Sequence, residues 1–315
     1  MRPIIIASAL AALVPGAAPA AAAQPNDELT VSQRTGSIRP PERSLEQLRR
    51  EAEAGDGEAQ NDLGTRLLDM RDPARQAEAR RWFQRASDSG NAEARNNLAT
   101  MLMFGIGGPA DEAGGRRLME EAAQMGSIGA RLSLAERYLQ GGDGYPRDHG
   151  RAYEQIRAAA GSSGPARLYA QWRLAMMHLQ GVGTPRDPQE AYRLLVSASE
   201  AGGVEAMISR AVMLATGEGV AEDDGAARRW YQRAAESGER GFEHALRGLG
   251  SMLAAGEGGP VDLPRGIAYL RIAQAAGDEN AAAILQAFSD RITPEIDEQA
   301  RRIAGEWMRR HLPTE

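Results

Sequence analysis

The stretch GEGVAEDDGAARRWYQRAAESG, from Gly217 to Gly238, decides how this sequence folds. Its first letters resemble a glycine-rich phosphate-binding loop. Such a loop follows a strand, occurs once, and in the P-loop class needs a lysine. The chain contains no lysine, and the glycine pair recurs in other segments. The other pairs are Gly105 and Gly107, Gly181 and Gly183, and Gly256 and Gly258. We therefore predict that Gly217 and Gly219 form a turn between helices, with no nucleotide bound.

Around this stretch the chain repeats itself with a period of 35 to 39 residues. Most units carry an alanine, a leucine followed by a small residue, a glycine turn and an aspartate, in that order. Small side chains let helices approach closely, glycine ends the first helix of a unit, and aspartate caps the second. This period predicts a solenoid of paired helices. The glycines that close the units are Gly55, Gly90, Gly126, Gly164, Gly202, Gly238 and Gly277.

The composition also favours helices. Hydrophobic residues make up 42% of the chain but aromatic residues only 5%, and strong helix formers such as alanine, leucine and arginine are abundant. The predicted fold class is all-α, a right-handed α-solenoid of about six helix pairs over residues 44–311. Ser44 caps an N-terminal helix, with Gln47 in capping-box spacing. Residues 293–311 form a C-terminal capping helix with an apolar stripe of Ala300, Ile303, Ala304 and Trp307.

The N-terminal residues have the pattern of a secretory signal peptide. Arg2 precedes an apolar run over residues 4–14, and small residues suited to cleavage follow. We expect residues 1–23 to be a signal peptide and the polar, proline-containing residues 24–43 to be a flexible leader. The predicted location is the periplasm, with secretion as the alternative.

Composition and spacing exclude several kinds of chemistry. The absence of cysteine rules out thiol catalysis and zinc–thiolate sites, and the absence of lysine rules out Schiff-base enzymes. A net charge of −6 argues against nucleic acid and anionic lipid as partners. We expect no metal, no cofactor and no catalytic residues, since no convergent set of reactive side chains is evident. The histidines lie in different units, at His149, His178, His244 and His311.

The repeat pattern resembles the Sel1-like repeat, a relative of the tetratricopeptide repeat. The best matches are WYQRAAESG (230–238), WFQRASDSG (82–90) and GVGTPRD (181–187). The resemblance covers residues 45 to about 307. It implies a protein that binds other proteins, with family roles in periplasmic signalling to membrane sensors or in assembling envelope and exopolysaccharide machinery. Some secreted relatives hold each unit with a disulfide, which this chain cannot form.

The first helices of such solenoids line a concave surface used for binding. Residues two before and two after the leucine of each first helix are predicted to face it. The middle members are apolar and include Trp172 as an aromatic anchor, so we predict a groove for a segment of a partner protein. Packing of these side chains between adjacent helices, as core, is the alternative. The predicted groove residues are Asn61, Asn96, Leu132, Glu136, Trp172, Met176, Ile208, Val212 and Arg247.

A second predicted surface is a row of arginines on the second helices, each nine residues before a closing glycine. The row could meet an acidic partner or an anionic glycan, although solvated arginines paired with nearby glutamates would give the same pattern. These residues are Arg81, Arg117, Arg193 and Arg229. The predicted function is a non-catalytic periplasmic adaptor for a protein of the cell envelope. The alternative is a protein that binds or modifies cell-wall glycan, which would need several converging rings and carboxylates.

Overall fold

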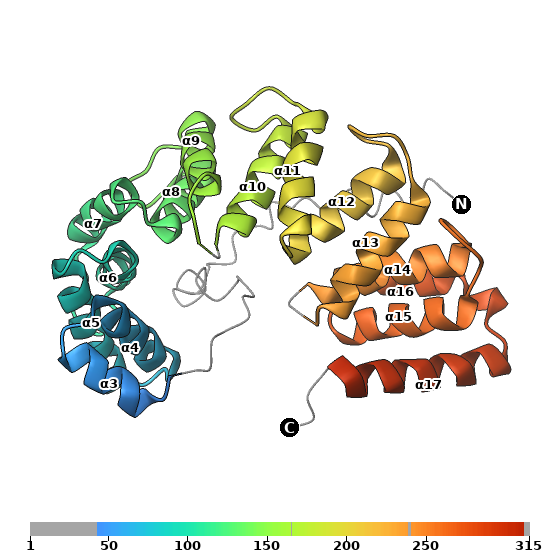
Figure 1. Ribbon diagram of the computed structural model, residues 1–315, viewed down its shortest axis with the longest axis horizontal. Helices are drawn as coiled ribbons and strands as arrows, with labels where there is room; N and C mark the ends of the chain where they lie inside the picture. Colours follow the sequence, from blue (N-terminus) through green and yellow to red (C-terminus); the bar gives the residue numbers. More distant parts are fainter. Residues whose placement is uncertain (1–42, 165, 239–240, 312–315) are drawn as a thin grey trace. The chain divides into compact units, whose positions relative to one another are not determined.

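The computed structural model describes residues 43–164, 166–238 and 241–311 (Figure 1). The expected signal peptide, and the leader apart from Arg43, lie outside these residues. Backbone contacts divide the chain into two compact units. The N-terminal unit includes residues 43–174 with 182–184, and the C-terminal unit includes residues 175–181 with 185–311. The division falls inside helix α10 (Arg167–Gln180).

The N-terminal unit is a run of helices in which each helix packs on the next along the chain (Figure 1). Before the start of α10, the run is α3 (Leu45–Glu53), α4 (Gly57–Asp69), α5 (Pro73–Asp88), α6 (Ala92–Phe104), α7 (Glu112–Gln124), α8 (Ile128–Gln140) and α9 (His149–Ala160).

The C-terminal unit continues the same scheme after the end of α10. Its helices are α11 (Pro188–Glu200), α12 (Val204–Thr216), α13 (Asp224–Glu236), α14 (Phe242–Ala255), α15 (Leu263–Ala275), α16 (Glu279–Ala287), the short 3-10 helix η2 (Ser289–Arg291) and α17 (Pro294–His311). Helix α17 lies along α15 (Figure 1). Within each unit this is the stacked helix-pair arrangement of an α-solenoid, as predicted.

The glycines of the opening stretch form a turn between α12 and α13. Gly217 and Gly219 have φ angles of 72° and 71°, in the left-handed region that glycine enters without strain. A Cβ at Gly219 would lie 2.4 Å from the carbonyl oxygen of Pro188 at the start of α11. The Asp223 side chain then caps α13 by accepting a hydrogen bond of 2.8 Å from the Ala226 amide. These contacts confirm the prediction of a helix-connecting turn.

The core of both units is built from small and branched aliphatic side chains. Ala59 and Leu63 on α4, Ala206 on α12 and Leu249 on α14 occupy the predicted alanine and leucine positions and are buried. The small residue after the leucine brings the second helix close, since a Cβ at Gly64 would lie 2.7 Å from the Phe83 ring. Close approach of the paired helices is thus a property of these sequence positions.

The two ends of the repeat array carry the predicted capping helices. Ser44 Oγ accepts a hydrogen bond of 3.1 Å from the Gln47 amide at the start of α3. On α17, Ala300, Ala304 and Trp307 are buried, as predicted from the apolar stripe. Among the described residues, no helix is both long and apolar enough to cross a membrane.

Helix α16 was missing from the sequence-based prediction, which placed no helix between Gly277 and the C-terminal capping helix. Its signal is the one that marks the first helix of the earlier units. Ala281 follows Gly277 by four residues and is fully buried. The chain therefore begins a further first helix after the last complete pair, and α17 packs where a second helix would follow.

Candidate binding site

The predicted groove residues differ in exposure. The buried members are Asn96, Leu132, Met176, Val212 and Arg247. They are buried because successive first helices contact each other, as α6 does with α8 and α12 with α14. Burial between helices agrees with the alternative of core packing for Asn96, Leu132 and Met176, whereas Val212 and Arg247 line a recess described below. The partly exposed members are Asn61, Glu136, Trp172 and Ile208, whose role in binding stays a prediction.

In the N-terminal unit, the partly exposed polar residues Asn61 and Glu136 already have partners inside the protein. The Asn61 Oδ1 atom accepts a hydrogen bond of 3.0 Å from Asn97 Nδ2. A Glu136 carboxylate oxygen lies 2.8 Å from Arg173 Nη2, in a part-buried ion pair. These contacts connect neighbouring first helices, so they stabilise the stacking of units.

The arginines predicted to form a row on the second helices, here called the convex row, are exposed at every position. Arg81 and Arg117 belong to the N-terminal unit, and Arg193 and Arg229 to the C-terminal unit. Arg193 makes an ion pair with Glu190 at 2.5 Å, and this hydrogen bonding holds the pKa of Glu190 below its usual value. Arg193 is therefore a solvent-exposed arginine paired with a nearby glutamate, which is the alternative stated for this row.

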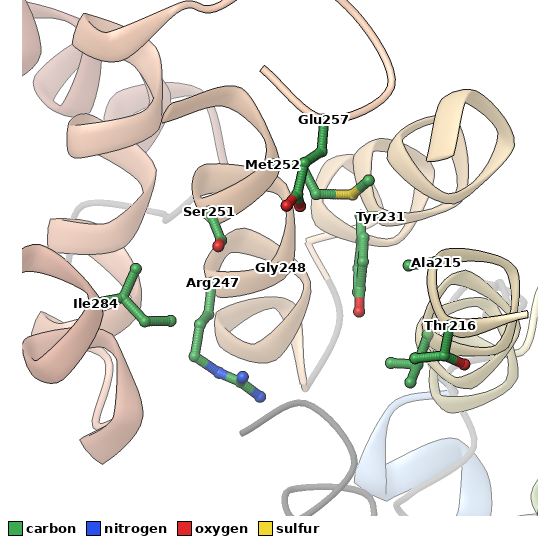
Figure 2. Close-up of a pocket in the computed structure, with 10 residues that line it drawn as sticks. Ala215, Thr216, Tyr231, Arg247, Gly248, Ser251, Met252, Glu257 and Ile284 are labelled. Carbon is green, nitrogen blue, oxygen red and sulfur yellow. The ribbon is translucent and has the colours of Figure 1, made fainter. Parts of the chain in front are cut away.

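A recess lies wholly inside the C-terminal unit (Figure 2). Its cavity volume is about 40 Å³, and it is open to solvent on one side. Its walls come from α12, α13, α14, the loop after α14, and α16, and most of the wall surface is apolar. The lining residues are Val212, Ala215, Thr216, Tyr231, Arg247, Gly248, Ser251, Met252, Glu257 and Ile284.

Helix α13 contributes Tyr231 to the wall of the recess, and the position of this ring depends on Gly248 in α14. A Cβ at Gly248 would lie 2.5 Å from the Tyr231 ring, so the ring packs directly against the α14 backbone. Tyr231 is 5% exposed, and burial raises the pKa of its phenol to about 12. The phenol is therefore neutral at physiological pH, and the ring forms a fixed wall of the recess.

Arg247 is the cationic group of the recess, and a buried carboxylate holds it in place. Its Nε donates a hydrogen bond of 2.8 Å to Asp278 Oδ2, and His244 Nδ1 lies 2.8 Å from the same oxygen. Burial by itself raises the pKa of Asp278, but hydrogen bonding to His244 and the charge of Arg247 outweigh burial and hold that pKa below its usual value. The guanidinium is thus anchored through Nε. Within the described part of the chain, its two terminal nitrogens have no hydrogen-bond partner.

Ser251 lies one helical turn after Arg247, on the same face of α14. Its side chain is buried, and its Oγ has no hydrogen-bond partner among the residues that the structure describes. Hydroxyls at the same repeat position behave differently in the first two pairs. Thr65 and Thr100 donate to the carbonyl oxygens four residues earlier, at 3.1 and 3.2 Å. The Ser251 hydroxyl is therefore the exception at this position.

Among the residues of this recess, the sequence predicted Val212, Arg247 and Ser251 to face the binding surface, and Val212 and Arg247 to be groove residues. Ser251 occupies the position two after the leucine, which also holds Glu136 and Val212. Tyr231 and Ile284 had no such signal, because they lie on helices outside the predicted surface.

Comparison with known proteins agrees with the repeat register. A family model described as "Sel1 repeat" matches residues 57–91, 92–127, 130–154, 168–203, 204–239 and 243–278, more than half of the chain. The chain belongs to the Sel1 repeat family. Sel1 repeats generally mediate protein–protein interaction and typically form non-catalytic scaffolds. The six matched segments correspond to the six helix pairs from α4–α5 to α14–α15.

Two solved structures of Sel1 repeat proteins are similar to this chain. One is c5321, a protective antigen present in uropathogenic Escherichia coli strains that displays an SLR fold. It is 26% identical with a TM-score of 0.63, and the match covers 84% of this chain and 56% of the antigen. The other is a Sel1 repeat protein from Oxalobacter formigenes, 22% identical with a TM-score of 0.62, matched over 74% of this chain and 100% of its own. This chain therefore spans little more than half of the antigen's length. A comparison with curated proteins gave no match.

Within the described residues, no group of three or more histidine and acidic side chains is placed to hold a metal ion. The recess walls combine one guanidinium, one carboxylate, three hydroxyl-bearing side chains and several apolar side chains. This combination can orient a bound group by charge and hydrogen bonds while burying its apolar part.

Proposed function

We propose that this Sel1 repeat protein is a non-catalytic adaptor of the bacterial cell envelope that binds a segment of another envelope protein. The observation that carries the proposal is the recess of the C-terminal unit. Its apolar walls surround the buried Ser251 hydroxyl and the anchored Arg247 guanidinium. Sites that receive a group from another molecule are commonly built this way, with few polar groups in an apolar wall.

The surface near the recess offers further contact area on the same unit. Ile208 lies one helical turn before Val212 on α12 and is partly exposed. A segment seated in the recess can extend over α12 towards Ile208, which would serve as an apolar contact outside it. In the N-terminal unit, Trp172 is the corresponding candidate, and its role is tested separately.

The proposal also covers where the protein is located and which kind of envelope process it serves. The signal-peptide pattern of residues 1–23 supports export, with the periplasm as the proposed compartment. Within the envelope, we propose that the adaptor regulates a membrane sensor or an exopolysaccharide assembly, which are the roles that the family resemblance implies. Fractionation of cells that express the full chain, with N-terminal sequencing of the mature protein, tests the location. An uncleaved protein in the cytoplasm would contradict it.

Binding is tested by capture from envelope extracts with tagged mature protein. The variant Ala215→Trp fills the recess from α12, whereas the matched control Ala221→Trp adds the same ring at an exposed position of the following loop. We expect a protein that is retained by wild type and by the control but lost from the recess variant. Helical circular dichroism checks that each variant is folded.

Two results would overturn this proposal. Equal retention by Ala215→Trp would place binding elsewhere, and a Trp172→Ala variant then tests the N-terminal unit. Retention of cell-wall fragments without any protein would favour the glycan-binding alternative.

A further inference from the structure

We infer that α13 carries a site for an acidic side chain of a partner protein, with the carboxylate bound by the indole N–H of Trp230 beside Arg210 and Arg233. These residues are not among those that line the recess, so the site is additional to the one in the proposed function. The inference rests on that function only in taking the partner to be a protein.

Trp230 is a partly exposed ring that two guanidinium groups contact. The Cζ atoms of Arg210 and Arg233 lie 4.3 and 5.2 Å from the centre of the ring. Stacking on the ring is favourable for a cation, so both charges stay close to it. Within the described residues, the indole nitrogen of Trp230 has no hydrogen-bond partner. Because an indole N–H and a guanidinium can only donate, this place offers donors and lacks an acceptor.

Helix α5 shows the same motif with the acceptor present. Its sequence RRWFQRA (80–86) corresponds to RRWYQRA (228–234) on α13. The Cζ atom of Arg85 lies 4.7 Å from the centre of the Trp82 ring, as expected from the shared motif. On α5, a carboxylate oxygen of Glu78 accepts a hydrogen bond of 3.5 Å from the indole nitrogen of Trp82. The protein thus shows in its own first unit how this motif holds a carboxylate.

On α13 that carboxylate is missing. Glu78 lies twelve residues before its closing glycine, and the residue at the same place on α13 is Ala226. Arg49, which pairs with Glu78 at 2.8 Å, has Val196 of α11 as its counterpart. Both replacements are apolar and partly exposed, so they can contact the methylene groups of an incoming glutamate while its carboxylate takes the place of Glu78. A phosphate or sulfate ion would leave these two side chains uncovered.

The positive charge of the site comes from a departure from the repeat. Arg210 occupies the position of α12 at which the other complete pairs carry leucine. Its Nη1 donates a hydrogen bond of 3.1 Å to Ser199 Oγ and lies 3.4 Å from the exposed Glu200. Glu200 offsets one of the two cations, whereas Arg233 has no ion pair within the part of the chain that the structure describes. At physiological salt, charges interact over about 8 Å, so the remaining charge attracts an acidic group to the ring.

The test observes the indole N–H signals of the ¹⁵N-labelled mature protein, in which Trp230→Phe assigns the signal of the site. The probes are a blocked peptide of alternating glutamate and alanine and the same peptide with glutamine in place of glutamate. We expect a saturable downfield shift of the Trp230 signal with the glutamate peptide and at least tenfold weaker binding of the glutamine peptide. The Trp82 signal should not move, because its N–H is already bonded to Glu78.

Three variants connect this binding to the proposed groups. Ala226→Glu places a carboxylate where α5 has Glu78, so it should shift the Trp230 signal without peptide and weaken peptide binding at least tenfold. An acid in the first turn of a helix is favourable, so this variant should fold. Ala221→Glu, at an exposed position of the preceding loop, adds the same charge and should weaken binding less than twofold. Arg233→Gln should weaken binding several-fold, whereas Arg117→Gln on α7 should leave it unchanged.

The contrary outcomes are distinct. Equal binding of the glutamine peptide would rule out recognition of a carboxylate, and full binding to Ala226→Glu would place the carboxylate elsewhere. Tighter binding of an oligogalacturonate than of the peptide would assign the site to an anionic glycan and overturn the choice of partner. If the peptide fails to bind while a protein is still captured through the recess, the proposed function stands and this inference is wrong. If the peptide binds as expected but no protein is captured, the site exists and the proposed function is wrong.

Discussion

A pair of substitutions in the turn between α12 and α13 separates backbone strain from steric contact. Gly217 and Gly219 lie in one loop and have almost the same φ, 72° and 71°. Their surroundings differ. A Cβ at Gly217 would have its nearest neighbour at 3.5 Å, an ordinary contact with Glu222, whereas a Cβ at Gly219 would lie 2.4 Å from the Pro188 carbonyl oxygen.

The structure sets the size of each effect. Alanine in the left-handed region costs roughly 1–2 kcal/mol, and this cost applies equally to Gly217→Ala and Gly219→Ala. The gain from restricting the unfolded chain is also shared, so it cancels in the comparison. At Gly219 the new methyl group must push the first turn of α11 away, which adds an overpacking cost of about 1–3 kcal/mol. We expect Gly219→Ala to be the less stable variant by this last amount.

The measurement is urea denaturation of both variants, followed by helical circular dichroism, together with hydrogen exchange of the α11 and α12 amides. Hydrogen exchange is needed because repeat proteins can open locally instead of as a whole. The faster exchange in Gly219→Ala should centre on α11. Equal losses in the two variants would refute the reasoning, because they would mean that φ alone determines the role of these glycines.

Three further predictions concern the capping helix, the buried carboxylate and the exposed arginines. Trp307→Ala should lower the free energy of unfolding by about 3–5 kcal/mol in thermal denaturation, because this side chain is only 6% exposed. Met308→Ala, at 39% exposure, should change it by less than about 0.5 kcal/mol, and equal effects would contradict the capping role. The Asp278 pKa lies below its usual 3.8, so its carboxylate stabilises the fold above that pH and the stabilisation is lost as the pH falls through the lowered pKa. Asp278→Asn should therefore make the free energy of unfolding, measured with urea at each pH, fall less steeply as the pH is lowered below about 4. An unchanged dependence on pH would exclude this contribution. Arg193→Ala should leave the thermal midpoint unchanged, since its ion pair with Glu190 is on the surface, and a clear drop would show that the convex row is structural.

The location of the turns and helix starts could be predicted from short stretches of sequence. Asp223 predicts a cap because its side chain bonds to an amide three residues ahead, and Gly217 predicts a helix end because only its own backbone conformation is involved. The backbone conformation of Arg71 could not be predicted in this way. It adopts a φ of 53° in the first unit, which lacks the glycine turn, so the left-handed conformation there depends on its surroundings.

Exposure could not be predicted in the same way. Ile208 and Arg247 occupy the same register position of successive first helices, yet Ile208 is partly exposed and Arg247 is buried against Asp278. The register fixes the face of the helix on which a residue lies. The distance to the next helix, and the side chains that fill it, depend on residues more than thirty positions away.

The sequence by itself thus determined the repeat, the helix pairs, the capping helices and the family. These features depend on periodicity and on hydrogen bonds between residues a few positions apart. Only the tertiary structure decided which predicted groove residues are core and where a recess opens in the C-terminal unit. The recess exists because α12, α13, α14 and α16 pack around Gly248 and leave Arg247 and Ser251 facing inward. Such a space is a property of the packing between helices, and no single repeat unit contains it.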